Sequence, residues 1–383
     1  MELLTKPDWH ESETRMRAWW QGEVIDRPVL LVKSPRSGMS RAEWEAISSP
    51  EDVPPHDILD WFTNPERVVA RNNRTVDATF WGGEAFPVTF PVSTRMVAIT
   101  AAYVGCPYSL DPVSHTGWAD SIIDDWDARK SIEFDVDNEW WQISRKLLDA
   151  SASVAKGRYY VGMPDLNAPG EMVALLRDTQ RLAFDLIDDP APIPSAIEEA
   201  NRAWYRYWQA ANGIVHQWID GYFYWMGIWS DIASTDLQCD FNALISPRMF
   251  DEYFLPGLEQ QTRWVDRTIF HLDGPGAIPH LDSLLALPRL NGIQWVPGDG
   301  KAPMHHWLPL LRRIQAKGKS LVLACEPYEV EKLIGGLEPE GLLLSTTCDS
   351  EGEAQDLLRK ADRFVKLRSW MLPEEPAGSD ALV

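Results

Sequence analysis

The sequence predicts an α/β fold of the (β/α)8, or TIM-barrel, class with an N-terminal helical extension. The first observation is size: 383 residues, 45% of them hydrophobic, suffice for one large core. The second is an alternation of helical and apolar strand-like segments from residue 136 onward, which is typical of parallel strands joined by helices. The third is the count of eight strand-like segments. We expect one barrel domain over 1–372, with the helical addition at about 1–26, and a flexible tail at 373–383.

The N-terminal third supplies the extension and the first two strands. An amphipathic helix is predicted at 9–24, and Ile25-Asp26-Arg27-Pro28 stops it before a strand at 29–32. Helical periods broken by prolines occupy 39–80. A turn at 82–87 then leads into an extended apolar stretch, the second strand.

The rest of the chain alternates regularly. Ser246-Pro247 is a typical helix start and Gly318 a typical helix end. The predicted helices cover 138–156, 169–187, 192–215, 246–265, 276–286, 303–317, 328–335 and 351–367. The predicted strands cover 159–162, 222–226, 267–271, 292–295, 320–324 and 342–345.

Composition argues against several classes of protein. The 57 acidic and 36 basic residues give a formal net charge of −21, which repels nucleic-acid backbones and anionic membrane surfaces. The first eight residues lack the features of a signal peptide, and no apolar run of about 18 residues could span a membrane. Four cysteines occur without CxxC spacing, which favours a reducing compartment. We therefore expect a cytoplasmic protein.

The segment Phe270-His271-Leu272-Asp273 is the most informative in the chain. It ends an apolar, β-branched run, and residues two apart in an extended strand point to the same side. His271 and Asp273 can therefore bind one ion together. Cys348 ends the last strand-like run, and the carboxyl ends of barrel strands share one face. The three residues then form a three-ligand set with room for a fourth group, as in catalytic zinc sites.

Other polar and aromatic residues are expected at the same face of the barrel. Glu84, Asp165, Asp231 and Asp273 are candidates for general acid or base. The candidate substrate-binding residues are Trp225, Trp229, Gln294, Trp295, Lys33 and Arg36, the tryptophans as pocket walls and the two cations as carboxylate ligands.

Each metal-site candidate also has a structural interpretation. His271 could be a hydrogen-bonded structural histidine, Asp273 a helix cap and Cys348 a small buried hydrophobe. Cys239, next to Asp240, is a rival thiolate. Most of the 19 tryptophans are expected to pack in the core. The glycine-rich segment after Gln294 lacks the spacing of a phosphate-binding loop, so nucleotide binding has no support.

The order of these motifs resembles the uroporphyrinogen decarboxylase superfamily, a family of (β/α)8 barrels. The resemblance rests on His-x-Asp-Gly after a strand, on residues 290–298 (LNGIQWVPG) and on residues 243–258 (ALISPRMFDEYFLPGL). It runs from about Arg27 to Phe364 and is most specific over 237–300. The chain is most similar to the decarboxylase-like branch that is related to cobalamin-dependent methyltransferases.

The resemblance separates two activities. The decarboxylases bind propionate arms with arginines in a motif R-P-V-W that continues M-R-Q-A-G-R. Here Arg27-Pro28-Val29 matches the start, but Lys33-Ser34-Pro35-Arg36-Ser37 follows, so the arginine clamp is largely absent. The methyltransferases hold zinc with H-x-C and a later cysteine. His271 and Cys348 match those positions, and Asp273 stands at the middle position, where a carboxylate makes zinc a stronger Lewis acid.

The sequence thus predicts a zinc-dependent, methyltransferase-like enzyme with His271, Asp273 and Cys348 as ligands. The resemblance implies that a separate corrinoid protein carries the methyl group and that the substrate is a small methoxy or methylamine compound. A homodimer is compatible with this interpretation. The alternatives are a metal-free decarboxylase or lyase acting on a small carboxylate, and a protein that binds a saccharide or quaternary ammonium compound with its tryptophans.

Overall fold

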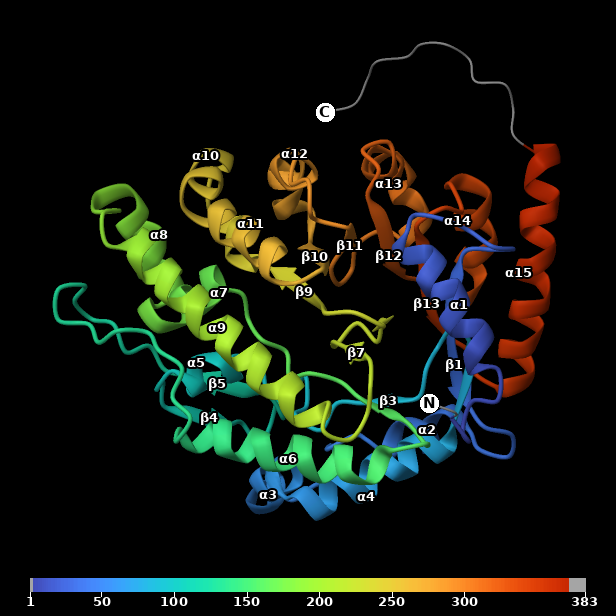
Figure 1. Ribbon diagram of the computed structural model, residues 1–383, viewed down its shortest axis with the longest axis horizontal. Coiled ribbons are helices and arrows are strands. Elements are labelled where there is room, and N and C mark those ends of the chain that lie inside the picture. The colour runs from blue at the N-terminus through green and yellow to red at the C-terminus, as the bar shows by residue number, and fades with distance from the viewer. Residues whose placement is uncertain (1–2, 372–383) are drawn as a thin grey trace, which may run out of the picture.

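The computed structural model describes residues 3–371, so the predicted tail at 373–383 lies outside the described residues. Its centre is a seven-stranded sheet in the order β2-β1-β13-β12-β11-β10-β9 (Figure 1). All neighbouring strands run parallel except β2, which is antiparallel to β1. The strands are β1 (Val29–Pro35), β2 (Thr79–Gly83), β9 (Ser234–Gln238), β10 (Arg267–Asp273), β11 (Gly292–Val296), β12 (Ser320–Ala324) and β13 (Leu342–Thr347).

The predicted α/β class is confirmed, but a closed barrel is not. Within the described residues the sheet ends at β2 and β9. A parallel pair, β3 (Val88–Thr89) with β6 (Tyr160–Val161), is separate from it. Two antiparallel pairs complete the strands: β4 (Tyr108–Leu110) with β5 (Gly117–Ala119), and β7 (Tyr222–Phe223) with β8 (Trp229–Ser230).

Helices surround the strands and follow the predicted alternation (Figure 1). Those of the N-terminal part are α1 (Trp9–Trp20), α2 (Arg41–Ala46), α3 (Ile58–Thr63), α4 (Pro65–Ala78), α5 (Ile99–Tyr103) and α6 (Glu139–Ala155). Those of the middle are α7 (Pro169–Arg177), α8 (Thr179–Asp188), α9 (Ile193–Val215), α10 (Pro247–Met249) and α11 (Leu255–Trp264). The last are α12 (Leu281–Leu285), α13 (Leu308–Gln315), α14 (Val330–Gly336) and α15 (Glu351–Met371).

The register of the sheet gives it two chemically different faces. Residues paired across parallel strands share a face, so Lys33, Thr347, Gln294, His271 and Gln238 lie on one face, here called the inner face. The alternate residues form the outer face, which packs against the helices. They are apolar and fully buried: Phe270, Leu272, Ile293, Trp295, Leu321, Leu323, Leu342 and Leu344.

Helix α1 closes the amino end of the sheet, which is opposite to His271. The indole of Trp20 lies under the guanidinium of Arg267, the first residue of β10, at 5.2 Å. Ser12 donates to the carbonyl of Gly83, which pairs with Leu31 near the start of β1. Gly83 has a φ of +58°, and a Cβ there would lie 2.3 Å from a backbone oxygen, so only glycine fits this close approach.

The sequence analysis missed two strands of the main sheet, β2 and β9, and misplaced another strand. β2 lies in residues that were predicted as helix and turn. β9 was not predicted because Ser234-Thr235-Asp236-Leu237-Gln238 is mostly polar. The predicted strand at 222–226 is reduced to the two residues of β7, outside the main sheet. The polar residues of β9 are compatible with a strand because Asp236 and Gln238 face the inner side and Leu237 faces the helices.

Two predicted helices are each divided in the structure. The helix predicted at 169–187 breaks at Asp178, whose φ is +81°. The helix predicted at 246–265 contains a π-helical turn at Phe250–Phe254. Pro256 follows that turn, and because proline lacks an N–H it cannot continue the α-helical hydrogen bonding there.

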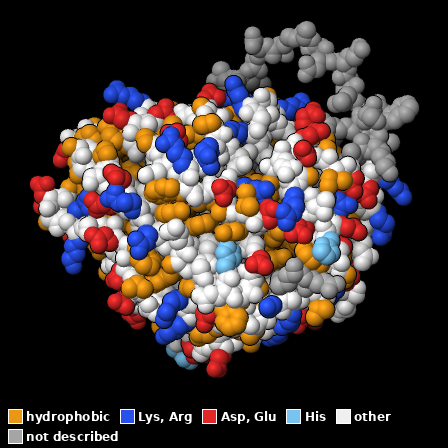
Figure 2. All heavy atoms as spheres, in the orientation of Figure 1, with side chains coloured by type: hydrophobic (Ala, Val, Ile, Leu, Met, Phe, Trp, Pro, Cys, Tyr) orange, Lys and Arg blue, Asp and Glu red, His pale blue; other side chains and the backbone are white. Residues whose placement is uncertain are grey.

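The surface agrees with the acidic but mixed composition. On the face shown in Figure 2, acidic and basic side chains are interspersed, and apolar side chains gather in the central part. Within residues 3–371, the helices all fall short of the combination of length and apolarity that a membrane crossing requires.

Candidate functional site

Polar side chains concentrate on the inner face where β9, β10 and β11 end. Asp236 and Gln238 come from β9, His271 and Asp273 from β10 and Gln294 from β11. The same face also carries apolar residues, such as Ile269, which pairs with Asp236, and Val322, which pairs with Gln294. The side chains that can bind a metal or exchange protons therefore lie at the carboxyl edge of the sheet, as expected for parallel strands.

Asp240, His271 and Asp273 form the group best suited to hold a metal ion. Each offers one ligand atom, and these atoms lie within 4.8 Å of one another. Zinc binds oxygen and nitrogen at about 2.0–2.2 Å, so its ligand atoms lie roughly 3–4 Å apart, which small side-chain rotations achieve here. His271 is half-buried, whereas Asp240 and Asp273 reach solvent. A fourth ligand position would therefore be open to solvent.

The orientation of His271 also fits a metal ligand. Its Nδ1 lies 2.6 Å from Oε1 of Gln294. Because an amide oxygen can only accept, Nδ1 carries the proton, and Nε2 keeps its lone pair for a metal. Metal-binding histidines usually have such an acceptor behind them. Trp225 packs edge-to-face against the imidazole, with ring centroids 5.2 Å apart.

Two buried carboxyl groups lie behind the histidine. Gln238 donates to Asp165 at 3.0 Å, and the indole N–H of Trp225 donates to Asp236 at 2.8 Å. Burial raises the pKa of Asp165 to about 6, although Gln238 and His271 oppose this change. Burial also raises the pKa of Asp236 to about 7, and the charge of Asp165 adds to that effect. Both groups can therefore carry a proton near neutral pH.

A third buried carboxyl group, Glu171, belongs to the same acidic region. Burial and the charge of Asp240 raise its pKa to about 8, while the N–H groups of Asp240 and Phe241 donate to it and oppose the shift. Although Asp240 reaches solvent, partial desolvation raises the pKa of its carboxyl group, with His271 opposing and Asp273 reinforcing the change. A bound cation would relieve this accumulation of negative charge.

Glu84 lies in a different network, at the closed amino end. It follows β2, and because β2 runs antiparallel its end lies opposite to the ends of β9–β11. Its carboxylate is fully buried, accepts from Arg27 at 2.6 and 2.9 Å and from the N–H of Leu30 at 2.9 Å. Glu84 therefore forms a structural ion pair with Arg27. It lies at the end of the sheet opposite to the carboxyl ends of β9–β11, where its predicted role as an acid or base would have placed it.

Asp231 and Trp229 also lie at the closed end. Asp231 bonds Arg267, the first residue of β10, at 2.6 Å, and it pairs with Arg17 of α1. Six residues of extended strand, roughly 20 Å, separate Arg267 from Asp273. Trp229 is buried against Phe86, with ring centroids 5.7 Å apart. Neither residue contributes to the edge that carries His271.

The structure does not bring Cys348 to the group formed by Asp240, His271 and Asp273. Cys348 follows β13, and β11 and β12 lie between β13 and β10. Its side chain is fully buried, and burial raises the pKa of its thiol to about 12. The rival Cys239 is buried too, and burial raises the pKa of its thiol well above the usual value. Asp240, next to it, is the third member of the group that could hold a metal ion.

The remaining predicted substrate-binding residues divide between the two faces. Trp295 lies on the outer face, buried against Trp307 with ring centroids 5.0 Å apart, so it is a core residue. Lys33 lies on the inner face of β1. Arg36 follows β1 in a loop, where its N–H donates to the carbonyl of Ala78.

Sequence reasoning missed Glu171, Asp236 and Asp240. The period-two alternation of Asp236, Gln238 and Asp240 indicates a strand with one polar face, and this signal was available in the sequence. Glu171 gave no such signal, since it lies in the first turn of α7 and its burial depends on tertiary packing.

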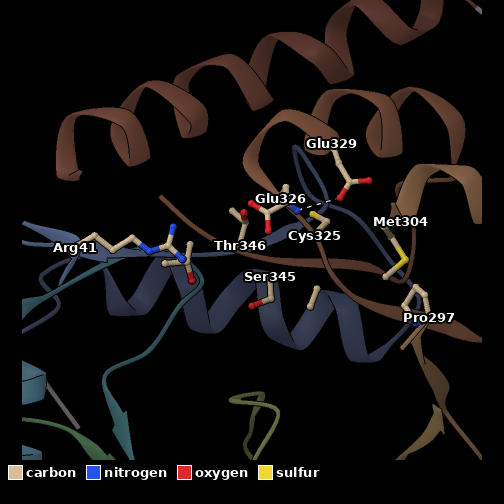
Figure 3. A pocket seen from close by; sticks show the side chains of 10 residues that line it. Arg41, Pro297, Met304, Cys325, Glu326, Glu329, Ser345 and Thr346 are labelled. Carbon is tan, nitrogen blue, oxygen red and sulfur yellow. Dashed lines mark hydrogen bonds between the residues drawn. The ribbon is translucent and has the colours of Figure 1, made fainter. Parts of the chain in front are cut away.

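A cavity of about 350 Å3 lies at the same edge, at the ends of β12 and β13 (Figure 3). Ala324, Ser345 and Thr347 line it from the inner face. Cys325, Glu326 and Arg41 contribute to its walls. The carboxyl edge thus has an acidic part on β9–β11 and a hydroxyl-lined part on β12–β13.

Comparison with known proteins gives information on the fold. No protein-family model matches the chain, and no curated protein matches it. Among solved structures it is similar to a methyltransferase from Methanosarcina mazei, with a TM-score of 0.60 and 14% sequence identity. The likeness covers 92% of this chain and 98% of that one. The resemblance to the uroporphyrinogen decarboxylase superfamily stays a prediction, whereas the fold of a methyltransferase is shared over nearly the whole chain.

Proposed function

We propose that this protein is a metal-dependent, methyltransferase-like enzyme with its active site at the carboxyl edge of β9–β11. It moves a methyl group between a small methoxy or methylamine compound, or another acceptor, and a corrinoid held by a separate carrier protein. The name of the structural neighbour supports methyl transfer. The observation that carries the proposal is the grouping of Asp240, His271 and Asp273 around one point.

The proposed ligand set differs from the one predicted from sequence by one residue. Asp240 replaces Cys348, so that one imidazole and two carboxylates hold the ion. Nitrogen and oxygen ligands of this kind suit zinc and also other divalent ions of intermediate hardness. Zinc bound here would supply Lewis acidity toward an oxygen, nitrogen or sulfur atom of the substrate.

The surrounding residues have separate roles in this proposal. Gln294 fixes the imidazole of His271 through its Nδ1–H. Trp225 packs against that ring and limits the access of water. Asp165 accepts from Gln238 through Oδ1, so its second carboxyl oxygen can hold or release the proton that the reacting group exchanges.

Metal analysis of matched variants tests the ligand set. Wild type, His271→Ala, Asp240→Asn, Asp273→Asn and Cys348→Ala are purified from zinc-supplemented medium, and bound metal is measured by mass spectrometry. We expect loss of metal in the first three variants, because each removes a ligand, and retention in Cys348→Ala.

The Cys348→Ala variant separates the two ligand sets. Loss of metal from that variant together with retention in Asp240→Asn would return the assignment to His271, Asp273 and Cys348. Absence of metal from the folded wild type, even after incubation with zinc, would contradict both sets. Methyl transfer is then tested by following methylcobalamin absorbance with thiol and amine acceptors.

A further inference from the structure

Three lysines are strongly withdrawn from water, and burial lowers the pKa of each amine. Two of them have conventional structural roles. Lys6 donates to the carbonyls of Trp81 and Gly83 at 3.2 and 2.7 Å and pairs with Asp8. Lys319 donates to two backbone carbonyls, both within 2.7 Å. Their hydrogen bonds account for their burial.

Lys33 is different because it lacks such partners. Among the side chains that the structure describes, which end at residue 364, no acceptor or carboxylate lies at hydrogen-bond or ion-pair distance from its Nζ. Its contact is the indole of Trp81, the residue paired with it on β2, whose ring centroid is 5.5 Å from Nζ. An aromatic face stabilises a charged amine only weakly compared with a carboxylate. Burying an unpaired ammonium is costly, so this arrangement favours the neutral amine.

The position of Lys33 makes that amine accessible to a ligand. It is half-buried and lies on the inner face near the carboxyl end of β1. Its register partner on β13 is Thr347, which lines the cavity of about 350 Å3, as does Ser345 two residues earlier (Figure 3). Lys33 is not itself among the residues that line the cavity, but it lies one strand away from these hydroxyl-bearing residues, on the same face of the sheet.

We propose that Lys33 is a nucleophilic amine that captures a small aldehyde or 2-oxo acid entering this cavity as an imine. Neutral lysines in desolvated positions are the usual nucleophiles toward carbonyl groups. This activity is separate from the metal group on β9–β11, and its test is independent of the proposed methyl transfer.

The chemical step is balanced without any further reactant. The lone pair of Nζ attacks the carbonyl carbon, and the carbonyl oxygen takes up a proton from the nitrogen to give a carbinolamine. Loss of the second nitrogen proton with the hydroxyl group releases one water and leaves the C=N bond. No oxidant or reductant is consumed.

Reductive trapping tests the proposal on the full-length protein. The folded protein is incubated at neutral pH with glyoxylate and sodium cyanoborohydride, which converts an imine to a stable carboxymethyl-lysine, and peptide mapping locates the label. We expect the label at Lys33 before any other lysine, and its loss in Lys33→Met. Lys319→Arg serves as the matched control and keeps the label, because Lys319 is buried but hydrogen-bonded.

The mapping result in the wild type decides the outcome without depending on how any variant folds. Label confined to exposed lysines, or equal at Lys33 and Lys319, would overturn the proposal. Trapping that persists in His271→Ala and in the presence of a chelator supports an amine site independent of the metal group. Failure of trapping leaves the metal analysis above unaffected, so the two proposals are tested separately.

Discussion

His271 shows how a single side chain acquires its chemical state from a neighbouring strand. The residue pairs with Gln294 on β11, and the amide oxygen of Gln294 fixes the proton on Nδ1. Sequence could predict His271 from its place at a strand end. It could also name Gln294 as polar, but the hydrogen bond between them follows only from the register of β10 and β11.

We expect Gln294→Leu to weaken metal binding without unfolding the protein. The change removes the acceptor for the Nδ1–H of His271 and keeps a similar side-chain volume. Loss of such a partner typically costs about 10–100-fold in metal affinity. Zinc affinity is measured by competition with a chromogenic chelator. Gln217→Leu, an exposed glutamine that bonds only its own helix, is the control and should leave affinity unchanged.

Glu84 illustrates the opposite outcome, a predicted catalytic acid that is structural. We expect Glu84→Gln to lower the free energy of unfolding by about 3 kcal/mol or more, because it leaves the buried charge of Arg27 without its main partner. Metal content should not change. Denaturant unfolding measures the effect, with Asp362→Asn as control.

The control shares the same arginine but differs in exposure. Asp362 lies 3.2 Å from Nε of Arg27 and is largely exposed, so its loss should cost only about 0–1 kcal/mol. Equal effects of the two substitutions would show that Glu84 is not the buried anchor described here.

At the scale of elements, the strands differed in how well they could be predicted. β10, β11, β12 and β13 are rich in apolar residues because their outer faces are fully buried, and sequence located all four. β9 was missed since its inner face is polar and its signal is carried by alternation rather than hydrophobicity. The part of the site that sequence missed, Asp236 and Asp240, lies on or directly after this strand.

Helix α9 offers a test of how one element is attached to the rest of the molecule. Glu199 accepts from Arg129 at 2.6 and 2.9 Å and from the N–H of Ile132 at 3.0 Å. The bonds from Arg129, with smaller contributions from Ile132, lower the pKa of Glu199 from 4.5 to about 2. The carboxylate therefore links α9 to the segment 129–132.

We expect this link to make stability depend on pH in the acidic range. Because the folded pKa is depressed, the contribution of Glu199 is fully present above about 4.5 and disappears as pH falls through about 2. It amounts to roughly 3 kcal/mol at neutral pH. Glu199→Gln should reduce the pH dependence of the free energy of unfolding between pH 5 and pH 2. Urea titrations measure this dependence, and Glu198→Gln, which changes an exposed neighbour, is the control. Parallel pH profiles for the two variants would refute the link.

At the scale of the whole molecule, the two ends of the sheet differ in how their charged groups are arranged. The amino end is closed by α1 and held by buried ion pairs, whereas the carboxyl edge collects carboxyl groups that burial leaves partly protonated. The sequence indicated which residues are charged. It could not indicate which end each would occupy, because the antiparallel direction of β2 is set by tertiary packing.

Metal binding at the carboxyl edge should stabilise the whole fold. A ligand at about 100 times its dissociation constant adds about 2.7 kcal/mol to the free energy of unfolding. For a domain of this size that corresponds to a rise in melting temperature of about 3 °C. Calorimetry of metal-stripped protein with added zinc measures the shift, and Asp240→Asn should abolish it. An equal rise in that variant would place the binding site elsewhere.

The alternation of faces along β10 has a consequence for how the protein tolerates genetic change. Phe270 and Leu272 are completely enclosed by the helix layer, so replacing them removes packing that keeps the chain folded. His271 is half-buried and Asp273 is exposed at the carboxyl edge, so under the proposed function replacing them should spare folding and remove activity. Neighbouring positions of one strand are thus expected to be under different selection. Phe270 and Leu272 are selected for the amount of folded protein, and His271 and Asp273 are selected for activity. A library of substitutions at residues 269–273 can be scored for both the amount of folded protein and its activity. The positions that affect each trait should then alternate along the strand.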